Sequence, residues 1–194
     1  MINKNNITGI VLAGGKSSRM GTDKGFLKLN NKYFVSYSID ALKPLVSETL
    51  IVSDNKDYDV FKCQRVEDTI KNTGPVAGIY SGLATSKTEF NLVLSCDIPF
   101  IKTEILQRLI TAIDDVHDVF QIKSNNKNMP LIALYKTTAL NAFNKALNED
   151  ERRLQTVLKS LKTKSVVLNK EEDNTTLNVN TPNQFKAIIN GNNY

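Results

Sequence analysis

The sequence predicts an α/β fold: a three-layer α/β/α arrangement, Rossmann-like, with a mostly parallel central sheet. Apolar runs at 7–13, 49–53 and 90–96, the first two rich in β-branched residues, are typical of strands covered on both faces. Stretches with helical periodicity lie between these runs. Strands that alternate with helices favour parallel pairing through right-handed crossovers.

The elements of the first half follow from local patterns. A helix is predicted at 33–42, and further helices are predicted at 76–86 and 103–113, each with an apolar stripe at helical spacing. Thr103, with Gln107 downstream, indicates an N-terminal cap for the last of these helices.

The second half is less regular. Polar stretches at 124–130 and 169–176 are expected to be mobile loops. The remaining patterns predict strands at 118–123, 131–136 and 165–168, and helices at 138–147, 153–161 and after Pro182.

Composition and charge restrict the class of protein. The 194 residues are 41% hydrophobic, which suits one globular domain, and the chain shows neither an apolar run of about 18 residues nor a leader pattern. We therefore expect a cytoplasmic protein that does not enter a membrane, with Cys63 and Cys96 reduced. The net charge of +5 is spread along the chain, which favours an enzyme for anionic substrates over a nucleic-acid binder.

The stretch LAGGKSSRMGTDKG, residues 12–25, leaves the first strand through two glycines and then gathers basic side chains. Its glycines match neither GxGxxG nor GxxxxGK[ST]. Glycine nevertheless lets backbone amides approach an oxyanion, and Arg19 and Lys24 add positive charge. Glycines alone indicate a tight turn, but the two cations favour a phosphate-binding loop.

Asp97 ends the most apolar run of the chain, in LVLSCDIPF. A carboxylate at such a position is costly unless something pairs with it. Mg²⁺ is one partner, because this ion takes one or two carboxylates and fills its other positions with water and substrate phosphate oxygens. A cap on the following helix or a salt bridge with Lys24 is the alternative, and the spacing leaves both open.

The segment EDTIKNTGPVAGIYSGL carries Gly74, Gly78 and Gly82 at four-residue intervals. Small residues on one helix face allow either close helix packing or close approach of a flat base. Asp68, ahead of them, can accept hydrogen bonds from guanine N–H groups or from a ribose hydroxyl.

The segment LNVNTP places Asn178 and Asn180 on one face of an extended stretch. Their amides are either within reach of a second substrate or part of a plain turn before the helix after Pro182. His117 is the only histidine of the chain and receives no role.

Together these motifs resemble those of the molybdenum cofactor guanylyltransferases, which are nucleotidyltransferases with a glycosyltransferase-A-like fold. The similarity runs from about Thr8 to Phe185. The opening loop is shared with cytidylyl- and sugar-nucleotide transferases, whereas the combination of GPVAGI, CDIPF and NVNTP is much narrower. The resemblance implies that GTP and a metal-bound molybdopterin phosphate react with the help of Mg²⁺ to give molybdopterin guanine dinucleotide and pyrophosphate.

The resemblance also implies a role for individual residues. Arg19, Lys24 and Asp97 are the expected catalytic residues, and Asp97 is the expected metal ligand. The expected binding residues are Leu12, Ala13 and Gly14 for the nucleotide, Gly15 and Lys24 for the phosphates, Asp68, Gly78 and Ser53 for the nucleoside, and Asn178, Asn180 and Arg152 for the pterin side. At the end of the strand 49–53 some relatives carry Asn where this chain has Ser53-Asp54-Asn55.

A single domain, residues 1–194, is expected, with 1–100 mainly binding the nucleotide and 101–194 mainly binding the acceptor. The nearest alternative is a related transferase that uses CTP or a sugar-1-phosphate acceptor. A non-catalytic nucleotide-binding or nucleic-acid-binding protein is the other alternative. Molybdenum insertion proteins and recipient apoenzymes are the protein partners that the resemblance suggests.

Overall fold

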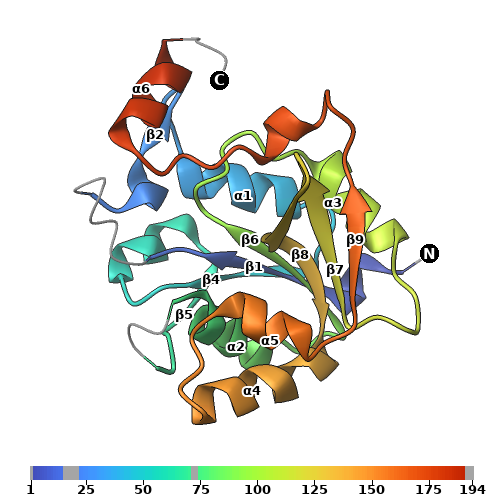
Figure 1. Ribbon diagram of the computed structural model, residues 1–194. Helices are drawn as coiled ribbons and strands as arrows, with labels where there is room; N and C mark the ends of the chain where they lie inside the picture. The colour runs from blue at the N-terminus through green and yellow to red at the C-terminus, as the bar shows by residue number, and fades with distance from the viewer. Residues whose placement is uncertain (1, 15–21, 71–73, 191–194) are drawn as a thin grey trace.

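The computed structural model describes residues 2–14, 22–70 and 74–190. These residues form a seven-stranded sheet with the order β5-β4-β1-β6-β8-β7-β9 (Figure 1). Four neighbouring strands are parallel: β5 (Gln64–Val66), β4 (Glu48–Val52), β1 (Ile7–Leu12) and β6 (Phe90–Ser95). The other three are β8 (Lys127–Lys136), antiparallel to both of its neighbours, β7 (Val119–Ser124), and β9 (Thr163–Val167), parallel to β7. The prediction of a mostly parallel sheet is confirmed.

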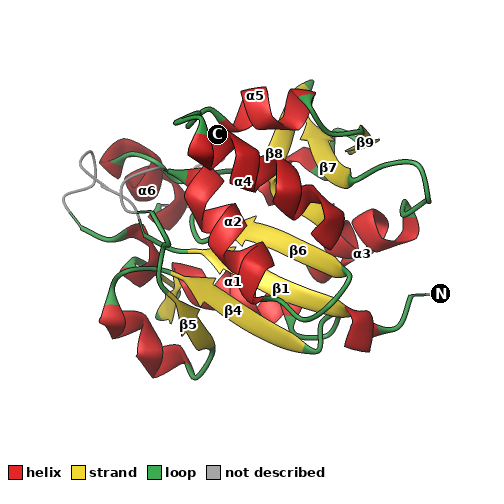
Figure 2. Ribbon diagram, turned by 90° about the horizontal axis from the view of Figure 1, so that it is seen from below, coloured by secondary structure: helices red, strands yellow, loops and turns green. Residues whose placement is uncertain are grey.

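Helices cover both faces of this sheet, which confirms the three-layer arrangement (Figure 1). One face packs against α1 (Phe34–Leu42) and α3 (Thr103–Thr111), and the other against α2 (Pro75–Thr85), α4 (Leu140–Asn148) and α5 (Leu154–Lys159), which Figure 2 shows in front of the sheet. Strand side chains alternate between the faces, so Val11 joins the first apolar cluster and Ile10 the second. This burial is the main stabilising contribution to the fold.

A smaller unit lies beside the end of the sheet. It contains β2 (Lys28–Leu29), which pairs with β3 (Lys32–Tyr33), and α6 (Pro182–Ile189). Residues of β2 and α6 share an apolar cluster with Phe34 of α1. The ring of Phe185 on α6 meets Phe34 edge-on, with centroids 5.8 Å apart. This contact holds the C-terminal helix close to the segment that follows the glycine loop.

Short 3-10 helices connect these elements: η1 (Lys4–Asn6), η2 (Lys24–Phe26), η3 (Lys56–Phe61), η4 (Thr137–Ala139) and η5 (Asp173–Thr176). The strands β2, β3 and β5 were not predicted, because two or three residues are too few to show a period. The 3-10 helices were not predicted as separate elements, and η4 overlaps the start of the helix predicted at 138–147. Within the described part of the chain, no helix is long and apolar enough to span a membrane. Both cysteines are free thiols, as expected.

The prediction of a mobile loop at 124–130 is wrong. β7 and β8 extend into this stretch, and Asn125 and Asn126, with φ of 48° and 60°, make a two-residue hairpin turn. The stretch looks like a loop because its side chains project from the hairpin tip, where backbone pairing rather than apolar burial maintains the strands.

Two further expectations are corrected. The stretch 169–176 ends in η5, where Thr176 is buried and its Oγ1 donates a hydrogen bond to Ser124 Oγ at 2.8 Å. Thr103 does not cap α3: the cap residue is Lys102, and Thr103 Oγ1 donates to the carbonyl of Ala41 at 3.0 Å. The threonine hydroxyl thus links α3 to α1, a tertiary contact that local spacing does not reveal.

Candidate functional site

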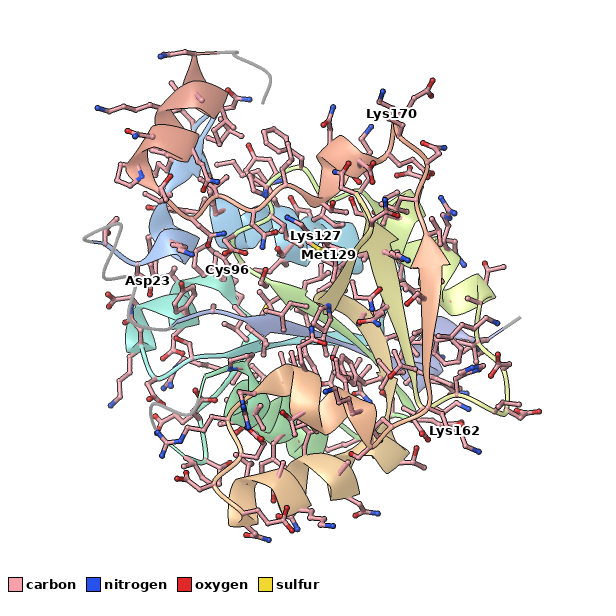
Figure 3. The ribbon with its side chains drawn as sticks, viewed as in Figure 1. Asp23, Cys96, Lys127, Met129, Lys162 and Lys170 are labelled. Carbon is pink, nitrogen blue, oxygen red and sulfur yellow. The ribbon has the colours of Figure 1, made fainter. Side chains whose placement is uncertain are left out.

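The carboxyl ends of β1, β4 and β6 lie side by side, which is where parallel sheets place their ligands. The pairing continues one residue beyond β1, since Ala13 N donates to Val52 O at 3.0 Å and Cys96 N donates to Leu12 O at 3.1 Å. Figure 3 shows Asp23 and Cys96 close together at this end of the sheet. The residues that follow the three strands therefore share one edge.

Three side chains from distant segments meet at this edge. Lys24 Nζ lies 3.2 Å from Asp97 Oδ2 and also donates a hydrogen bond to Asn180 Oδ1. Val179 N donates to Asp97 O at 2.9 Å, which holds the NVNTP segment against the tip of β6. The side chains of Lys24 and Asp97 are 21% and 13% exposed, so their ion pair is partly desolvated. Removal of either partner would leave a poorly solvated charge.

Asp97 has the salt bridge with Lys24 that the sequence left as an alternative to a metal. Its other oxygen, Oδ1, accepts a hydrogen bond from Ser95 Oγ at 2.5 Å, which orients the carboxylate. A partly exposed carboxylate that already attracts a cation fits Mg²⁺ held mainly by substrate oxygens and water. Among the described residues no group of three His, Cys, Asp or Glu side chains could enclose an ion. The described residues therefore do not support a metal ion whose ligands all come from the protein.

A second group lies around Leu12, Asp68 and Gly78. A Cβ at Gly78 would be 3.2 Å from Leu12 Cδ2 and 3.7 Å from Asp68 Oδ1. Asp68 Oδ1 is buried and receives no hydrogen bond from the described residues. Burial, and secondly the charge of Asp54, raises the pKa of Asp68 to about 6. A buried acceptor of this kind suits a ligand that presents N–H or O–H groups.

The glycines of the 67–83 segment serve different purposes. A Cβ at Gly82 would lie 2.7 Å from Ile10 Cγ2, so this glycine allows α2 to pack closely on β1. Gly74 precedes α2 with a φ of 69°, in the left-handed region. Gly78 alone of these three borders Asp68. Gly82 thus serves helix packing, Gly74 serves the backbone turn before α2, and Gly78 leaves space beside Asp68.

Gly14 lies beside Ser53 at the ends of β1 and β4. Its φ of 121° is in the region that favours glycine, and a Cβ there would be 3.1 Å from Ser53 Oγ. Ser53 is buried, and its Oγ accepts a hydrogen bond from Asn55 N at 3.2 Å. Cys96, which follows β6, is also buried, and burial raises the pKa of its thiol to about 12 and keeps it neutral.

Comparison with known proteins identifies the family. Residues 9–166 match the model of the MobA-like NTP transferase domain. The chain belongs to this family.

Relatives support the same assignment for this MobA-like transferase. A probable molybdenum cofactor guanylyltransferase from Flavobacterium johnsoniae is 33% identical, over 94% of this chain and 96% of that protein. A molybdenum cofactor guanylyltransferase from Vibrio vulnificus is 31% identical, over 91% of both chains. The crystal structure of molybdopterin-guanine dinucleotide biosynthesis protein A from Archaeoglobus fulgidus has a TM-score of 0.78 at 22% identity, covers 94% of this chain and 97% of that one, and shows the shared fold. The chain is a nucleotidyltransferase of the molybdenum cofactor guanylyltransferase group.

Not every residue expected at the site of this MobA-like transferase is placed there. Gly15 and Arg19 lie outside the described residues. Asn178 is exposed, and Arg152 is exposed with its guanidinium 2.9 Å from Asp150 Oδ1. The structure therefore gathers Lys24, Asp97 and Asn180 in one group, Leu12, Asp68 and Gly78 in a second, and Gly14 with Ser53 in a third.

Sequence reasoning missed Asp23, Tyr58 and Ser95, which surround the site of the MobA-like transferase. Asp23 Oδ1 accepts hydrogen bonds from Gly25 N at 3.1 Å and from Tyr58 Oη at 2.6 Å. An Asp two residues before a glycine is a pattern typical of such a cap, so Asp23 could have been found. Tyr58 and Ser95 carry no comparable local signal.

Proposed function

We propose that this chain transfers GMP from GTP to the terminal phosphate of metal-bound molybdopterin at the group formed by Lys24, Asp97 and Asn180. The observation that carries the proposal is the contact of Lys24 with both other residues. Lys24 and Asp97 belong to the proposed nucleotide half, 1–100, and Asn180 to the proposed acceptor half, 101–194, of a single domain. Two anionic substrates have to meet where these halves join.

The proposed reaction needs charge neutralisation and alignment more than covalent catalysis. An oxygen of the acceptor phosphate forms a bond to the α-phosphorus of GTP, and the bond from that phosphorus to the pyrophosphate oxygen breaks. The acceptor phosphate is already ionised at neutral pH, since its second pKa is about 6, so no general base is required. Lys24, together with Arg19, carries the charge that develops on the departing pyrophosphate.

Asp97 is the residue that would hold Mg²⁺, with Ser95 orienting its carboxylate. When bound, Mg²⁺ neutralises phosphate oxygens and so lowers the repulsion between the two substrates. Lys24 has to exchange its contact with Asp97 for contacts with phosphate oxygens during turnover. Asn180, which accepts from the same ammonium, then lies next to the acceptor phosphate.

The nucleoside is proposed to bind at the second group. Leu12, Ala13, Gly14 and Gly15 would contact the nucleotide through their backbone, while Ser53 and Gly78 border the base. The orphaned Oδ1 of Asp68 supports this placement, because a guanine edge or a ribose hydroxyl would supply its missing donor. Delivery of the product to molybdenum insertion proteins or recipient apoenzymes, in the cytoplasm, is proposed from the family resemblance alone.

A competition among nucleotides tests the proposed function. Purified protein with Mg²⁺ and metal-bound molybdopterin should release pyrophosphate with GTP and form a product with the mass of molybdopterin guanine dinucleotide. CTP and ATP should give little of either. Pyrophosphate release with CTP, or only with a sugar-1-phosphate acceptor, would favour the related transferases. GTP binding without pyrophosphate release would favour a non-catalytic binder.

The raised pKa of Asp68 predicts a pH-dependent affinity for GTP. Since the ionised carboxylate accepts the ligand's donors, affinity should rise as the pH passes about 6. Asp68→Asn should weaken binding by about 10- to 100-fold, the scale of losing charged hydrogen bonds, and remove this step in titrations of GTP between pH 5 and 8. Protonation of GTP itself would affect both proteins equally, so a step seen only in wild type is assigned to Asp68. Asp54→Asn should move the step to lower pH.

The same shift predicts the opposite trend for stability. The folded pKa of about 6 exceeds the ordinary value of 3.8, so protonated Asp68 favours the folded state. This contribution is present below pH 3.8 and is lost as the pH rises to about 6. Urea unfolding across this range should show a smaller decline for Asp68→Asn than for wild type. If wild type and Asp68→Asn showed the same pH dependence of GTP affinity and the same pH dependence of stability, the raised pKa of Asp68 would be contradicted.

A further inference from the structure

We propose that Tyr58 is a positioning residue for Lys24 and acts through the carboxylate of Asp23. The proposal rests on the proposed role of Lys24 in GMP transfer. Tyr58 lies in η3, which follows the end of β4, whereas Lys24 begins η2 after the glycine loop. The two residues are 34 positions apart in the sequence, and the link between them is the side chain of Asp23, which accepts hydrogen bonds from Tyr58 Oη and from the backbone N–H of Gly25.

The hydrogen bonds converge on both oxygens of Asp23. Tyr58 Oη donates to Asp23 Oδ1 at 2.6 Å, and the same oxygen accepts from Gly25 N at 3.1 Å, which caps η2. Asn55 Nδ2 donates to Asp23 Oδ2 at 3.4 Å. The residues on both sides of Lys24 are therefore held by one carboxylate, and that carboxylate is held from η3.

Packing leaves little freedom for this arrangement. Tyr58 has no exposed surface, and its ring centroid is 4.6 Å from that of Phe26 and 6.0 Å from that of Phe61. A Cβ at Gly25 would lie 2.1 Å from Tyr58 Oη, so only glycine allows this approach. Burial raises the pKa of Tyr58 far above its usual range, which leaves the hydroxyl protonated and able to donate.

The consequence for Lys24 is geometric. A lysine side chain is long and flexible, so its reach depends on where its backbone is fixed. With Asp23 and Gly25 held, Lys24 Nζ reaches both Asp97 Oδ2 and Asn180 Oδ1. A displacement of about 1 Å in a charged group at a reaction centre can cost about a hundredfold in rate, so this support matters for catalysis. Tyr58 touches neither of those oxygens and is a positioning residue only.

The first test requires no substrate. Tyr58→Phe keeps the ring and removes the donor, so Asp23 loses one of its anchors and Gly25 N–H should exchange with solvent about tenfold faster in native-state hydrogen exchange. Tyr135→Phe is the matched control, because Tyr135 is equally buried and its hydroxyl donates to Pro130 O at 2.8 Å. The control should leave Gly25 exchange unchanged. Equal exchange of Gly25 in wild type and Tyr58→Phe would overturn the proposal.

The second test is a double-mutant cycle on kcat/KM for GMP transfer. Tyr58→Phe alone should lower kcat/KM by about tenfold, whereas in a Lys24→Ala background it should change kcat/KM by less than about twofold, because the group it positions is gone. The effect of Tyr135→Phe should be the same in both backgrounds. Losses that simply add for Tyr58 and Lys24 would reveal a merely structural role and overturn the proposal. If the wild type transfers no GMP, the proposed function fails, while the exchange of Gly25 still decides whether Tyr58 holds this turn.

Discussion

Asp97→Ala is expected to lower kcat for GMP transfer about a thousandfold, because the charge stabilisation supplied by a bound cation is worth several kcal/mol. Asp97 also carries the ion pair with Lys24 and the hydrogen bond from Ser95, so the substitution removes the group around which the site is arranged. Pyrophosphate release at saturating GTP and Mg²⁺ measures the loss.

Two controls separate catalysis from folding in this prediction. Asp97→Asn keeps the size of the side chain and an acceptor for Ser95 but removes the charge, and it should be nearly as inactive as the alanine variant. Asp40→Ala removes an exposed carboxylate that pairs with Lys32, and it should retain wild-type activity. Urea unfolding should show that all three variants fold. Undiminished transfer by Asp97→Ala at saturating Mg²⁺ would refute the metal assignment.

Lys24→Ala is expected to lower kcat/KM for GTP by about 30- to 1,000-fold, which corresponds to losing one strong transition-state contact of about 2–4 kcal/mol. The substitution removes the ammonium that lies between Asp97 and Asn180, so charge on the departing pyrophosphate is left less neutralised. Steady-state kinetics with GTP, together with a titration of GTP binding, distinguish weaker binding from slower transfer.

Lys28→Ala is the matched control for Lys24. Lys28 lies four residues further on, is exposed and has its Nζ 4.7 Å from the ring centroid of Tyr33. Its removal should change kcat/KM by less than about twofold, as for an ordinary surface residue. A similarly small effect of Lys24→Ala would show that the loop does not neutralise phosphate charge.

The fold was predictable where the sequence shows clear apolar runs or helical periodicity. The apolar runs ending in Leu12, Val52 and Ser95 are strands of the parallel part of the sheet, where helices cover both faces and a strand therefore reads as a continuous apolar run. The hairpin around Asn125 and Asn126 was missed because its strands end beyond the covered part of the sheet. Local polarity then indicates a loop although the backbone is paired.

The sequence suggested the residue types of the candidate site but not their arrangement in space. The sequence alone pointed to Lys24 and Asp97, because glycines followed by cations favour a phosphate-binding loop and a carboxylate at a strand end needs a partner. It also offered their salt bridge as an alternative, and the structure contains that contact. The approach of Asn180 to Lys24 was not anticipated, since the two residues are 156 positions apart.

The sequence by itself determined the α/β class and the mostly parallel sheet, and it indicated the edge of the sheet where the candidate residues would lie. Apolar runs and their alternation with helical segments can be read from the order of residues along the chain. Only the tertiary structure decided that Tyr58 supports the turn carrying Lys24, that Gly82 packs on Ile10 while Gly78 borders Asp68, and that Asp68 Oδ1 has no donor among the described residues. Each of these depends on distances between side chains from separate elements, which are set by how the layers pack.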